Sequence, residues 1–452
     1  MMKHTGVFLG LAALLALFCL ASCINTDNTL GSALVPTSQD ITIKTATLDL
    51  PFEETRATAD LQSCVSNSIT VGNIGTEFYS EGLMSVTSSV DSVVWGSNPV
   101  VKRVYLSFAC DTTLVMQDDQ RNIPQNLYVH RLNFELDSSD VNGTVERFKK
   151  PYYDPEPVSL GGVVYTGGEA WSIDLKQEIG EQLLRIPMAT RDSAELFMKQ
   201  FYGFCLRGDY PDDAQVFPDQ EGRLTLFDLT SSYLILSWEY TDDEGNRKAS
   251  QAYFALGKYY TINLYHTLQT SSDAREGITV QGLTGGKPYL KASAIKRLIK
   301  QWADSQQIPE QDLVIAKATV EFPFEYDGDR TQFKFSAPSL YPCRKTKTAK
   351  GYPYYAPISE INNTELENGA IDRSLLQYKS NISLYLQSLL RKADSDLTEA
   401  DDLWFMPIYS FYNNTTGLTY HYADNFYYTK TRLNGTSAER HPVLRLTYSV
   451  LK

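Results

Sequence analysis

The chain has 452 residues, and its 41 basic against 54 acidic residues give a formal net charge of -13 at pH 7. That charge repels nucleic acid and anionic lipid headgroups, and it argues against a polynucleotide partner. The 29 tyrosines and 20 phenylalanines favour a strand-rich protein, because aromatic side chains suit pleated, half-buried surfaces.

The first residues are organised like a bacterial export signal. Lys3 makes the start positive, and the apolar run from Val7 to Leu20 that follows is too short to span a bilayer stably as a helix. The run ends in Leu-Ala-Ser-Cys at residues 20–23, which resembles the lipobox of bacterial lipoproteins, where the peptidase cuts before the cysteine and its sulfur carries a lipid. The sequence therefore predicts a signal peptide at residues 1–22 and a lipid on Cys23, with an ordinary secretory signal as the alternative.

The mature chain is long enough for two or three domains, or for one domain with a large insertion. Residues 23–38 are small and polar, which predicts a flexible tether. Residues 39–270 are expected to form a first β-rich region with two short helices, and residues 271–452 a second β-rich region with two helices. The two regions are predicted either as separate domains or as one composite domain.

Alternating apolar and polar residues predict the strands of the first region, and helical spacing predicts its helices. Strands are expected at residues 41–50, 68–74, 91–95, 100–109 and 126–136, and helices at 176–186 and 193–204. A hairpin is expected from strands at 232–240 and 249–256 that turn at residues 242–246.

The second region repeats an order of strand, short helix and strand, without a strict period that would favour a solenoid or propeller. The expected elements are helices at residues 294–302 and 374–391, and strands at 313–324, 402–411 and 442–450.

Several short motifs together resemble a known family. Beyond the lipobox they are Leu30-Gly31, Val35-Pro36, DSVVW at 91–95, VKRVYLSFA at 101–109, NLYVHRL at 126–132, YYD at 152–154 and HPVLRLTYS at 441–449. On these motifs, which span nearly the whole mature chain, the protein resembles a Bacteroidota lipoprotein family that carries the domain-of-unknown-function label DUF4270. The resemblance implies a cell-envelope lipoprotein and offers no catalytic residues to carry over. It favours a mainly β fold, a jelly-roll-like β-sandwich with a few short helical insertions, since many strands with polar turns bury best as packed sheets.

The location expected from these features is the outer membrane, with the protein held by a lipid on Cys23. Surface-exported lipoproteins of that phylum commonly carry acidic residues just after the lipidated cysteine, but here Asp27 is the single one in the first residues. The periplasmic and the cell-surface face therefore both stay open.

The familiar catalytic motifs are missing from the sequence. It contains no G-x-S-x-G elbow, no H-E-x-x-H, no P-loop and no G-x-G-x-x-G after a strand. His130, His266, His421 and His441 are far apart, and His130 and His441 are expected to be partly exposed strand residues. The sequence thus favours a non-enzymatic protein, with a glycoside hydrolase as an alternative because that chemistry needs only two carboxylates.

Two sets of side chains are candidates for binding. Hard cations prefer several oxygens on a flexible loop, so a calcium site is one hypothesis for an acidic loop, and a solvated loop is the other. The acidic residues are Asp209, Asp212, Asp213 and Asp219. Aromatic rings stack on sugars and anchor interfaces, or else cover the core. The aromatic candidates are Tyr354, Tyr355, Tyr412, Tyr420 and Tyr422. No other cofactor is expected.

The four cysteines after Cys23 are Cys64, Cys110, Cys205 and Cys343. Their wide spacing argues against a zinc site, and they allow three disulfide pairings or unpaired buried thiols.

The sequence favours an outer-membrane-anchored lipoprotein that acts as a binding or accessory subunit of an envelope protein complex. The expected partners are the lipid bilayer, reached through acylated Cys23, and an outer-membrane barrel protein. The alternatives are a surface protein that binds polysaccharide and, second, a glycoside hydrolase.

Overall fold

A computed structural model describes residues 43–450 of the chain. Its gaps lie at residues 53, 62–66, 75–77, 90–91, 112–123, 138–139, 141–150, 162, 166–169, 209–223, 268–270, 329, 331, 350, 352, 363–366 and 424–427. The lipobox, Cys64 and the acidic loop that begins at Asp209 therefore fall outside the described residues.

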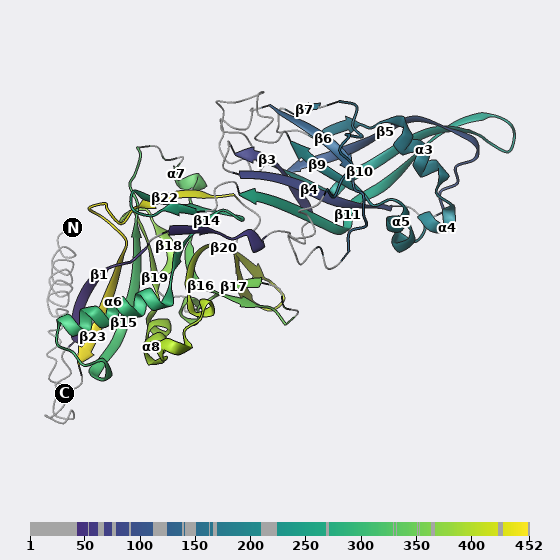
Figure 1. Ribbon diagram of the computed structural model, residues 1–452. Helices are drawn as coiled ribbons and strands as arrows, with labels where there is room; N and C mark the ends of the chain where they lie inside the picture. The colour runs from purple at the N-terminus through teal and green to yellow at the C-terminus, as the bar shows by residue number, and fades with distance from the viewer. Residues whose placement is uncertain are drawn as a thin grey trace, which may run out of the picture.

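The fold is mainly antiparallel β-structure with a few short helices, as predicted, and it is consistent with a β-sandwich. Figure 1 shows an elongated molecule built from two units. We call the unit that contains both ends of the described chain the proximal unit, and it comprises residues 43–58 together with 271–450. The other unit, the distal unit, comprises residues 68–267. Among the described residues no helix is both long and apolar enough to cross a membrane.

The distal unit is a nine-stranded sheet in the order β7-β6-β9-β4-β11-β10-β5-β8, with β3 paired to β10 and β4. The strands are β3 (Ser68–Ile74), β4 (Phe78–Ser88), β5 (Ser97–Asp111), β6 (Gln125–Arg131), β7 (Val163–Tyr165), β8 (Trp171–Asp174), β9 (Phe204–Gly208), β10 (Leu224–Thr241) and β11 (Arg247–Thr267). The predicted hairpin at residues 242–246 is confirmed, and it joins β10 to β11.

Three helices cover one face of this sheet (Figure 1). They are α3 (Gln177–Arg185), α4 (Met188–Arg191) and α5 (Ala194–Gln200). Phe197 of α5 stacks on Phe254 of β11 with 5.6 Å between ring centroids. α3 lies close to β5 because Gly180 faces Val101, where an added Cβ would come within 2.7 Å of a methyl group. Hydrophobic burial against the helices therefore fixes which face of the sheet points inward.

The proximal unit packs two larger sheets around one core. The five-stranded sheet contains β1 (Ile43–Asp49), β23 (Val443–Val450), β15 (Leu313–Pro323), β19 (Gln377–Asn381) and β18 (Asn368–Asp372), in that order. The seven-stranded sheet contains β12 (Ser271–Asp273), β2 (Glu54–Ala57), β14 (Gly286–Leu290), β20 (Leu403–Asn413), β16 (Leu340–Lys347) and β17 (Pro353–Pro357), with β21 (Leu418–Ala423) paired to β20. Phe322 of the first sheet meets Phe405 of the second with 4.7 Å between ring centroids.

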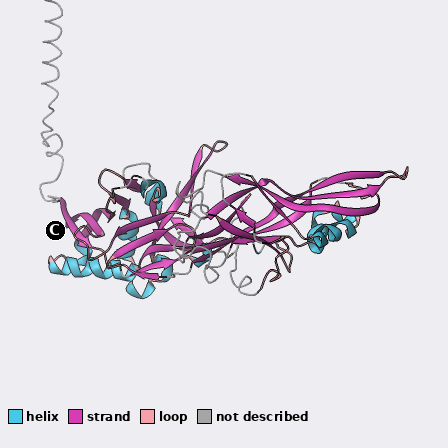
Figure 2. Cartoon of the chain, turned by 90° about the horizontal axis from the view of Figure 1, so that it is seen from above, coloured by secondary structure: helices cyan, strands magenta, loops and turns pink. Residues whose placement is uncertain are grey.

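The remaining elements of the proximal unit lie around these sheets. They are the two-stranded sheet of β13 (Gly277–Gln281) and β22 (Lys430–Asn434), and the helices α6 (Ala292–Ser305), α7 (Gln332–Phe335) and α8 (Ser383–Arg391). Figure 2 shows the helices in two groups, one in each unit.

The topology places the first strands in the proximal unit. β1 pairs with β23, and β2 pairs with β12 and β14. The distal unit is therefore an insertion between β2 and β12, which differs from the expected first region at 39–270. Leu48 of β1 lies opposite Leu444 of β23, and both side chains are buried in the proximal core, so burial draws β1 to the C-terminal strand.

Four predicted elements are wrong in whole or in part. The strand expected at 126–136 ends at Arg131, and the helix expected at 193–204 ends at Gln200. Residues 92–96 form a loop rather than a strand, because Trp95 turns inward and packs edge-on against Trp238 with 4.7 Å between ring centroids. The helix expected at 374–391 begins only at Ser383, because the preceding residues form β19, where Tyr378 and Ser380 alternate into the core.

A small apolar cluster joins the two units. Leu283, in the loop before β14, is fully buried together with Phe78, Leu224 and Tyr265 of the distal unit and with Tyr428. Its backbone is in the left-handed region at φ 49°, an unusual conformation for a branched side chain.

A buried amine holds the same loop. The Lys287 side chain is almost fully buried, and its Nζ donates to the Leu283 and Gly285 carbonyl oxygens at 2.5 and 2.8 Å and to Thr58 Oγ1 at 3.0 Å. These bonds tie β14 and the chain after β2 to the loop that carries Leu283.

Replacement of Leu283 by alanine should loosen this junction. Truncating a fully buried leucine to alanine lowers the free energy of unfolding by about 2–5 kcal/mol. Alanine is no better suited to the left-handed backbone conformation, so no gain offsets this loss. We expect Leu283→Ala to lower the free energy of unfolding measured in urea by that amount. Leu384→Ala on α8 is the matched control, since Leu384 is 55% exposed. A loss no larger than that of the control would contradict a role for the cluster in joining the units.

Candidate functional site

A buried carboxylate lies on the face of the distal sheet opposite α3 to α5. Glu81 of β4 is fully buried, and three side chains converge on it. The Tyr152 hydroxyl donates to Glu81 Oε1 at 2.6 Å, His266 Nε2 lies 3.0 Å from the same oxygen, and the Cys205 thiol donates to Oε2 at 3.5 Å. The carboxylate therefore has partners from three other parts of the distal unit.

Glu81 is held as a carboxylate. Burial by itself raises the pKa of Glu81, but the hydrogen bond and charge of His266, the Tyr152 hydroxyl and the charge of Arg207 together outweigh burial. The pKa of Glu81 therefore lies below its ordinary value of 4.5.

A second layer of polar groups adjoins the first. Arg207 of β9 donates to the Tyr79 hydroxyl at 3.2 Å and to the Tyr153 hydroxyl at 2.5 Å. His130 Nδ1 lies 2.8 Å from the Asp154 carbonyl oxygen, and its ring lies 4.7 Å from that of Tyr153. The expectation that His130 is partly exposed is wrong: it is buried, and burial lowers its pKa below the ordinary value of 6.5.

This cluster offers no activated thiol. Burial, the charge of Glu81 and the hydrogen bond to Glu81 raise the pKa of Cys205 well above its ordinary value of 9.0, so the side chain stays a thiol. A thiol nucleophile needs the opposite shift. The arrangement instead satisfies buried polar groups and fixes the register of β4, β9 and β11.

A row of mostly aromatic side chains crosses the other half of the same sheet face. Tyr105 of β5, Ile235 of β10 and Tyr253 of β11 lie directly opposite one another, so they form one row across three strands. Tyr253 is 42% exposed, and Tyr233 meets its ring edge-on with 5.9 Å between centroids. Small side chains surround the row, among them Ser107. Tyr105 and Tyr233 are half-buried and Ile235 is buried, so Tyr253 is the exposed ring of the row.

Planar polar groups flank the tyrosine row. The Arg103 guanidinium lies 4.1 Å from the centre of the Tyr105 ring, and its Nε donates to Asp174 at 2.6 Å. Gln251 Nε2 donates to Ser237 Oγ at 3.1 Å. An exposed ring beside amide, guanidinium and carboxylate groups on one sheet face is suited to binding by stacking and hydrogen bonding.

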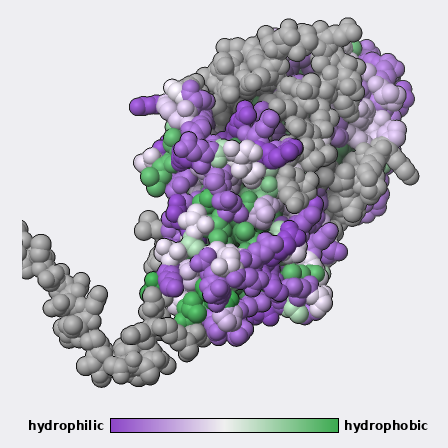
Figure 3. Space-filling view, turned by 60° about the vertical axis from the view of Figure 1, so that its left-hand side comes forward, coloured by the Kyte–Doolittle hydropathy of each residue, from purple (hydrophilic) through white to green (hydrophobic). Residues whose placement is uncertain are grey.

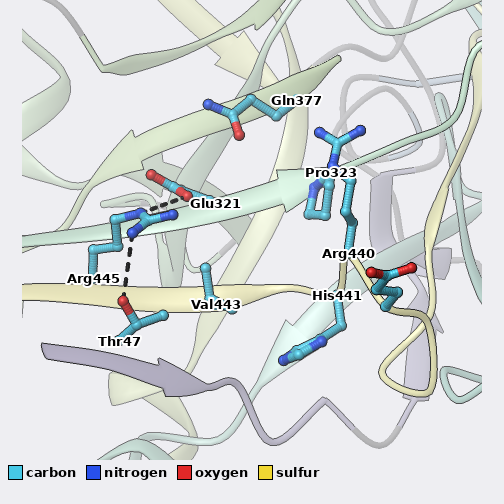
Figure 4. A pocket seen from close by; sticks show the side chains of 9 residues that line it. Thr47, Glu321, Pro323, Gln377, Arg440, His441, Val443 and Arg445 are labelled. Carbon is cyan, nitrogen blue, oxygen red and sulfur yellow. Dashed lines mark hydrogen bonds and ion pairs between the residues drawn. The ribbon is translucent and has the colours of Figure 1, made fainter. Parts of the chain in front are cut away.

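A hollow of about 210 Å³ lies on the outer face of the five-stranded sheet in the proximal unit (Figure 4). Its lining residues are Thr47, Glu321, Pro323, Gln377, Glu439, Arg440, His441, Val443 and Arg445. Arg445 Nε donates to Glu321 at 2.8 Å, and its Nη1 donates to Thr47 Oγ1 at 3.4 Å. Lys379 Nζ lies 3.5 Å from the other Glu321 oxygen.

The predicted aromatic residues differ in their exposure. Tyr355 is buried, packs on Trp404 and donates to Asp60 at 2.8 Å, as the core alternative expects. Tyr354 and Tyr420 are half-buried, and Tyr412 is 58% exposed. Tyr420 pairs with residue 411 and Tyr412 with residue 419, so the two tyrosines lie on opposite faces of the β20–β21 hairpin; the backbone of Tyr422 pairs with residue 409.

The other predictions concern the cation site, the lipidated cysteine and the disulfides. Asp209, Asp212, Asp213, Asp219 and Cys23 lie outside the described residues. Within the described residues no group of three or more metal-ligating side chains could hold a metal ion. Cys205 and Cys343 are both buried free thiols, so the unpaired alternative holds for these two.

Sequence reasoning missed the Glu81 cluster and the tyrosine row. Glu81 and His266 are 185 positions apart, and only strand pairing brings them together. A usable signal was the charge of Glu81 inside β4, whose run of otherwise uncharged residues predicts a strand that is buried on both faces.

Comparisons with known proteins add no family. No family model matches the chain, and no curated protein matches it. A solved structure of the Macrobrachium rosenbergii nodavirus aligns with 93% of this chain and 94% of that chain at 10% sequence identity, with a TM-score of 0.14. A TM-score this low carries no argument about fold or function.

The variant Glu81→Gln tests whether the charge of Glu81 stabilises the folded protein. Because the folded pKa of Glu81 is depressed, its charge adds stability that is present above pH 4.5 and is lost as the pH falls through the folded value. A glutamine at this position keeps an acceptor but no charge, so we expect a loss of about 1–3 kcal/mol at pH 7 and a shallower fall in stability below pH 4.5. Urea unfolding across pH measures both. Glu244→Gln in the exposed hairpin turn is the control, and equal acid slopes for Glu81→Gln and the native protein would refute the assignment.

Proposed function

We propose that the protein is a lipid-anchored, non-enzymatic binding protein of the outer membrane, which serves as an accessory subunit of an envelope protein complex. The lipobox that ends at Cys23 supports the anchor, and the predicted tether at 23–38 would link it to the fold. The absence of familiar catalytic motifs from the sequence and the unactivated thiol of Cys205 favour binding over catalysis.

One observation carries the proposal, namely that the described chain begins at one end of the elongated molecule. Its first residue, Ile43, lies opposite Ser449 near the end of β23. Figure 1 places this end of the proximal unit away from the β10–β11 hairpin of the distal unit. A tether of about 20 residues has a root-mean-square span of roughly 25 Å, so an anchor on Cys23 would keep the proximal unit near the bilayer and present the distal unit away from it. Tethering raises the effective concentration of a partner in the same membrane, so a modest interface suffices.

The surface is compatible with a non-obligate interface. On the coloured part of the face in Figure 3, hydrophilic residues are the most common, and hydrophobic residues lie between them in small groups. Non-obligate interfaces are of this mixed kind, and a few aromatic anchors contribute most of the binding energy.

The anchor and the complex can be tested in one preparation. We expect the native protein to incorporate labelled palmitate, to fractionate with outer membranes and to co-purify with a membrane barrel protein after mild detergent extraction. Cys23→Ser should abolish labelling and move the protein to the soluble fraction, because no acyl chain then holds it. Cys19→Ser, inside the apolar run of the signal, is the matched control and should change neither. Labelling that survives Cys23→Ser would contradict the anchor, and isolation of the native protein as a lone monomer would contradict the complex.

A surface glycan is the second candidate ligand, and the exposed Tyr253 ring of the tyrosine row favours it. Sugar rings stack on aromatic faces, and the amide of Gln251 and the guanidinium of Arg103 flank the row. A glycoside hydrolase ranks third. It needs two carboxylates facing a sugar, and Glu321 in the hollow is already bonded to Arg445.

If the row binds glycan, Tyr253→Ala should reduce retention on a polysaccharide-affinity gel at least tenfold, because stacking on the exposed ring is lost. Tyr326→Ala is the matched control, since Tyr326 is 41% exposed but lies in the proximal unit. Equal retention of Tyr253→Ala and the native protein, or no retention of the native protein on any polysaccharide of a broad array, would exclude this candidate.

A further inference from the structure

We propose that the hollow on the outer face of the five-stranded sheet binds a small zwitterion of the phosphoethanolamine type, which carries a phosphate and an ammonium group. The proposal goes beyond the proposed function, because binding of the soluble molecule needs no lipid anchor.

The hollow is formed by neighbouring strands and a loop. Thr47 of β1 pairs with Arg445 of β23, Val443 of β23 pairs with Glu321 of β15, and Pro323 of β15 pairs with residue 377 of β19. The loop of residues 439–441 before β23 completes the rim. Backbone pairing holds the floor, so the site exists without a ligand.

The lining carries both signs of charge. Arg440, Arg445 and His441 are the cationic side chains, and Glu321 and Glu439 are the carboxylates. A ligand with only negative charge would lie against the two glutamates, and one with only positive charge would lie against the arginines and the histidine. A zwitterion can place each of its charges beside the opposite one.

His441 contributes charge rather than a free donor. Its Nδ1 lies 3.1 Å from the Ala438 carbonyl oxygen, and its Nε2 lies 2.8 Å from Asp49 Oδ1. Both oxygens accept hydrogen bonds, so these contacts favour the protonated ring, in which both nitrogens donate. The hydrogen bond to Asp49 raises the pKa of His441 above its ordinary value of 6.5.

Some polar groups on the rim are left for a ligand. Arg445 uses Nε and Nη1 within the protein. Arg440 uses Nη2 on two backbone carbonyls, the nearer at 2.8 Å, and its Nη1 lies 3.9 Å from Glu325 Oε1. Among the described residues the Gln377 amide and the Glu439 carboxylate have no side-chain partner. Figure 4 shows Gln377, Arg440, Arg445 and Glu321 around one open space. Guanidinium groups suit the phosphate, and a carboxylate suits the ammonium.

Size and place fit the same ligand. A volume of about 210 Å³ has room for roughly seven or eight non-hydrogen atoms. The hollow lies on the sheet that begins with β1, where the chain enters the fold from the tether. The phosphate and ammonium could therefore come from a free metabolite or from a lipid headgroup, and only the lipid source rests on the proposed function.

Titration calorimetry of the detergent-solubilised full chain with O-phosphoethanolamine tests the site. We expect saturable binding, with inorganic phosphate and ethanolamine each binding at least tenfold more weakly. Arg440→Gln and Glu439→Gln should each weaken binding at least tenfold, since they remove the partners of opposite ends of the ligand. Gln377→Ala is a second rim variant, which breaks no side-chain bond within the described protein, and it should also weaken binding. Arg432→Gln on the exposed side of β22 is the matched control and should bind like the native protein.

Inorganic phosphate that binds as tightly as O-phosphoethanolamine, or an equal loss in Arg432→Gln and Arg440→Gln, would overturn the proposal. Vesicles then separate the two sources. Retention of the Cys23→Ser protein on phosphatidylethanolamine vesicles but not on phosphatidylglycerol vesicles supports the headgroup. Binding of the soluble molecule without retention on either vesicle supports a free metabolite. Since the calorimetry does not depend on the anchor, its failure leaves the lipoprotein assignment untouched.

Discussion

The pairing of β1 with β23 is the constraint on which the rest of the structure depends. It closes the chain by bringing the first described residues beside the last, and burial of Leu48 against Leu444 holds the two strands together. Asp49 and Thr47 add bonds to His441 and Arg445 across the same pair. The floor of the hollow follows from this strand pairing, and together with the pairing of β2 to β12 and β14 it makes the distal unit an insertion.

Insertion gives the distal unit two connections to the proximal unit, and buried polar groups at and beyond the junction make the arrangement specific. The Lys287 amine donates to the carbonyl oxygens of Leu283 and Gly285 and so fixes their loop. Glu81 is surrounded by Tyr152, His266 and Cys205. A buried charge is tolerated only when its partners are in place, so each cluster disfavours alternative packings of the loops around it. Both clusters therefore stabilise the packing of the distal unit and of the junction.

Local patterns in the sequence predicted much of the fold correctly. The alternation in β10 and β11 and the turn at residues 242–246 specified a hairpin, and the spacing of Ile179 and Leu183 specified α3. Prediction failed where tertiary packing overrode the local pattern. Leucines at 375 and 376 imitate a helical stripe, but Tyr378 fills the core from a strand, and Trp95 leaves a β-like run to pack on Trp238. Tyr412 and Tyr420 lie on opposite faces of their hairpin, and Tyr355 is buried beside half-buried Tyr354, because successive strand residues point to opposite faces.

The sequence by itself determined the mainly β class, the hairpin, most of the short helices and the expectation of a lipid on Cys23, because each of these is written in residues close together along the chain. Only the tertiary structure decided which strands pair, and so which distant residues meet. Glu81 with His266, Tyr105 with Tyr253, and Thr47 with Arg445 are all products of strand pairing across long separations. A single sequence encodes the propensity of each strand but not its partner, because register and pairing are set by burial summed over the whole sheet.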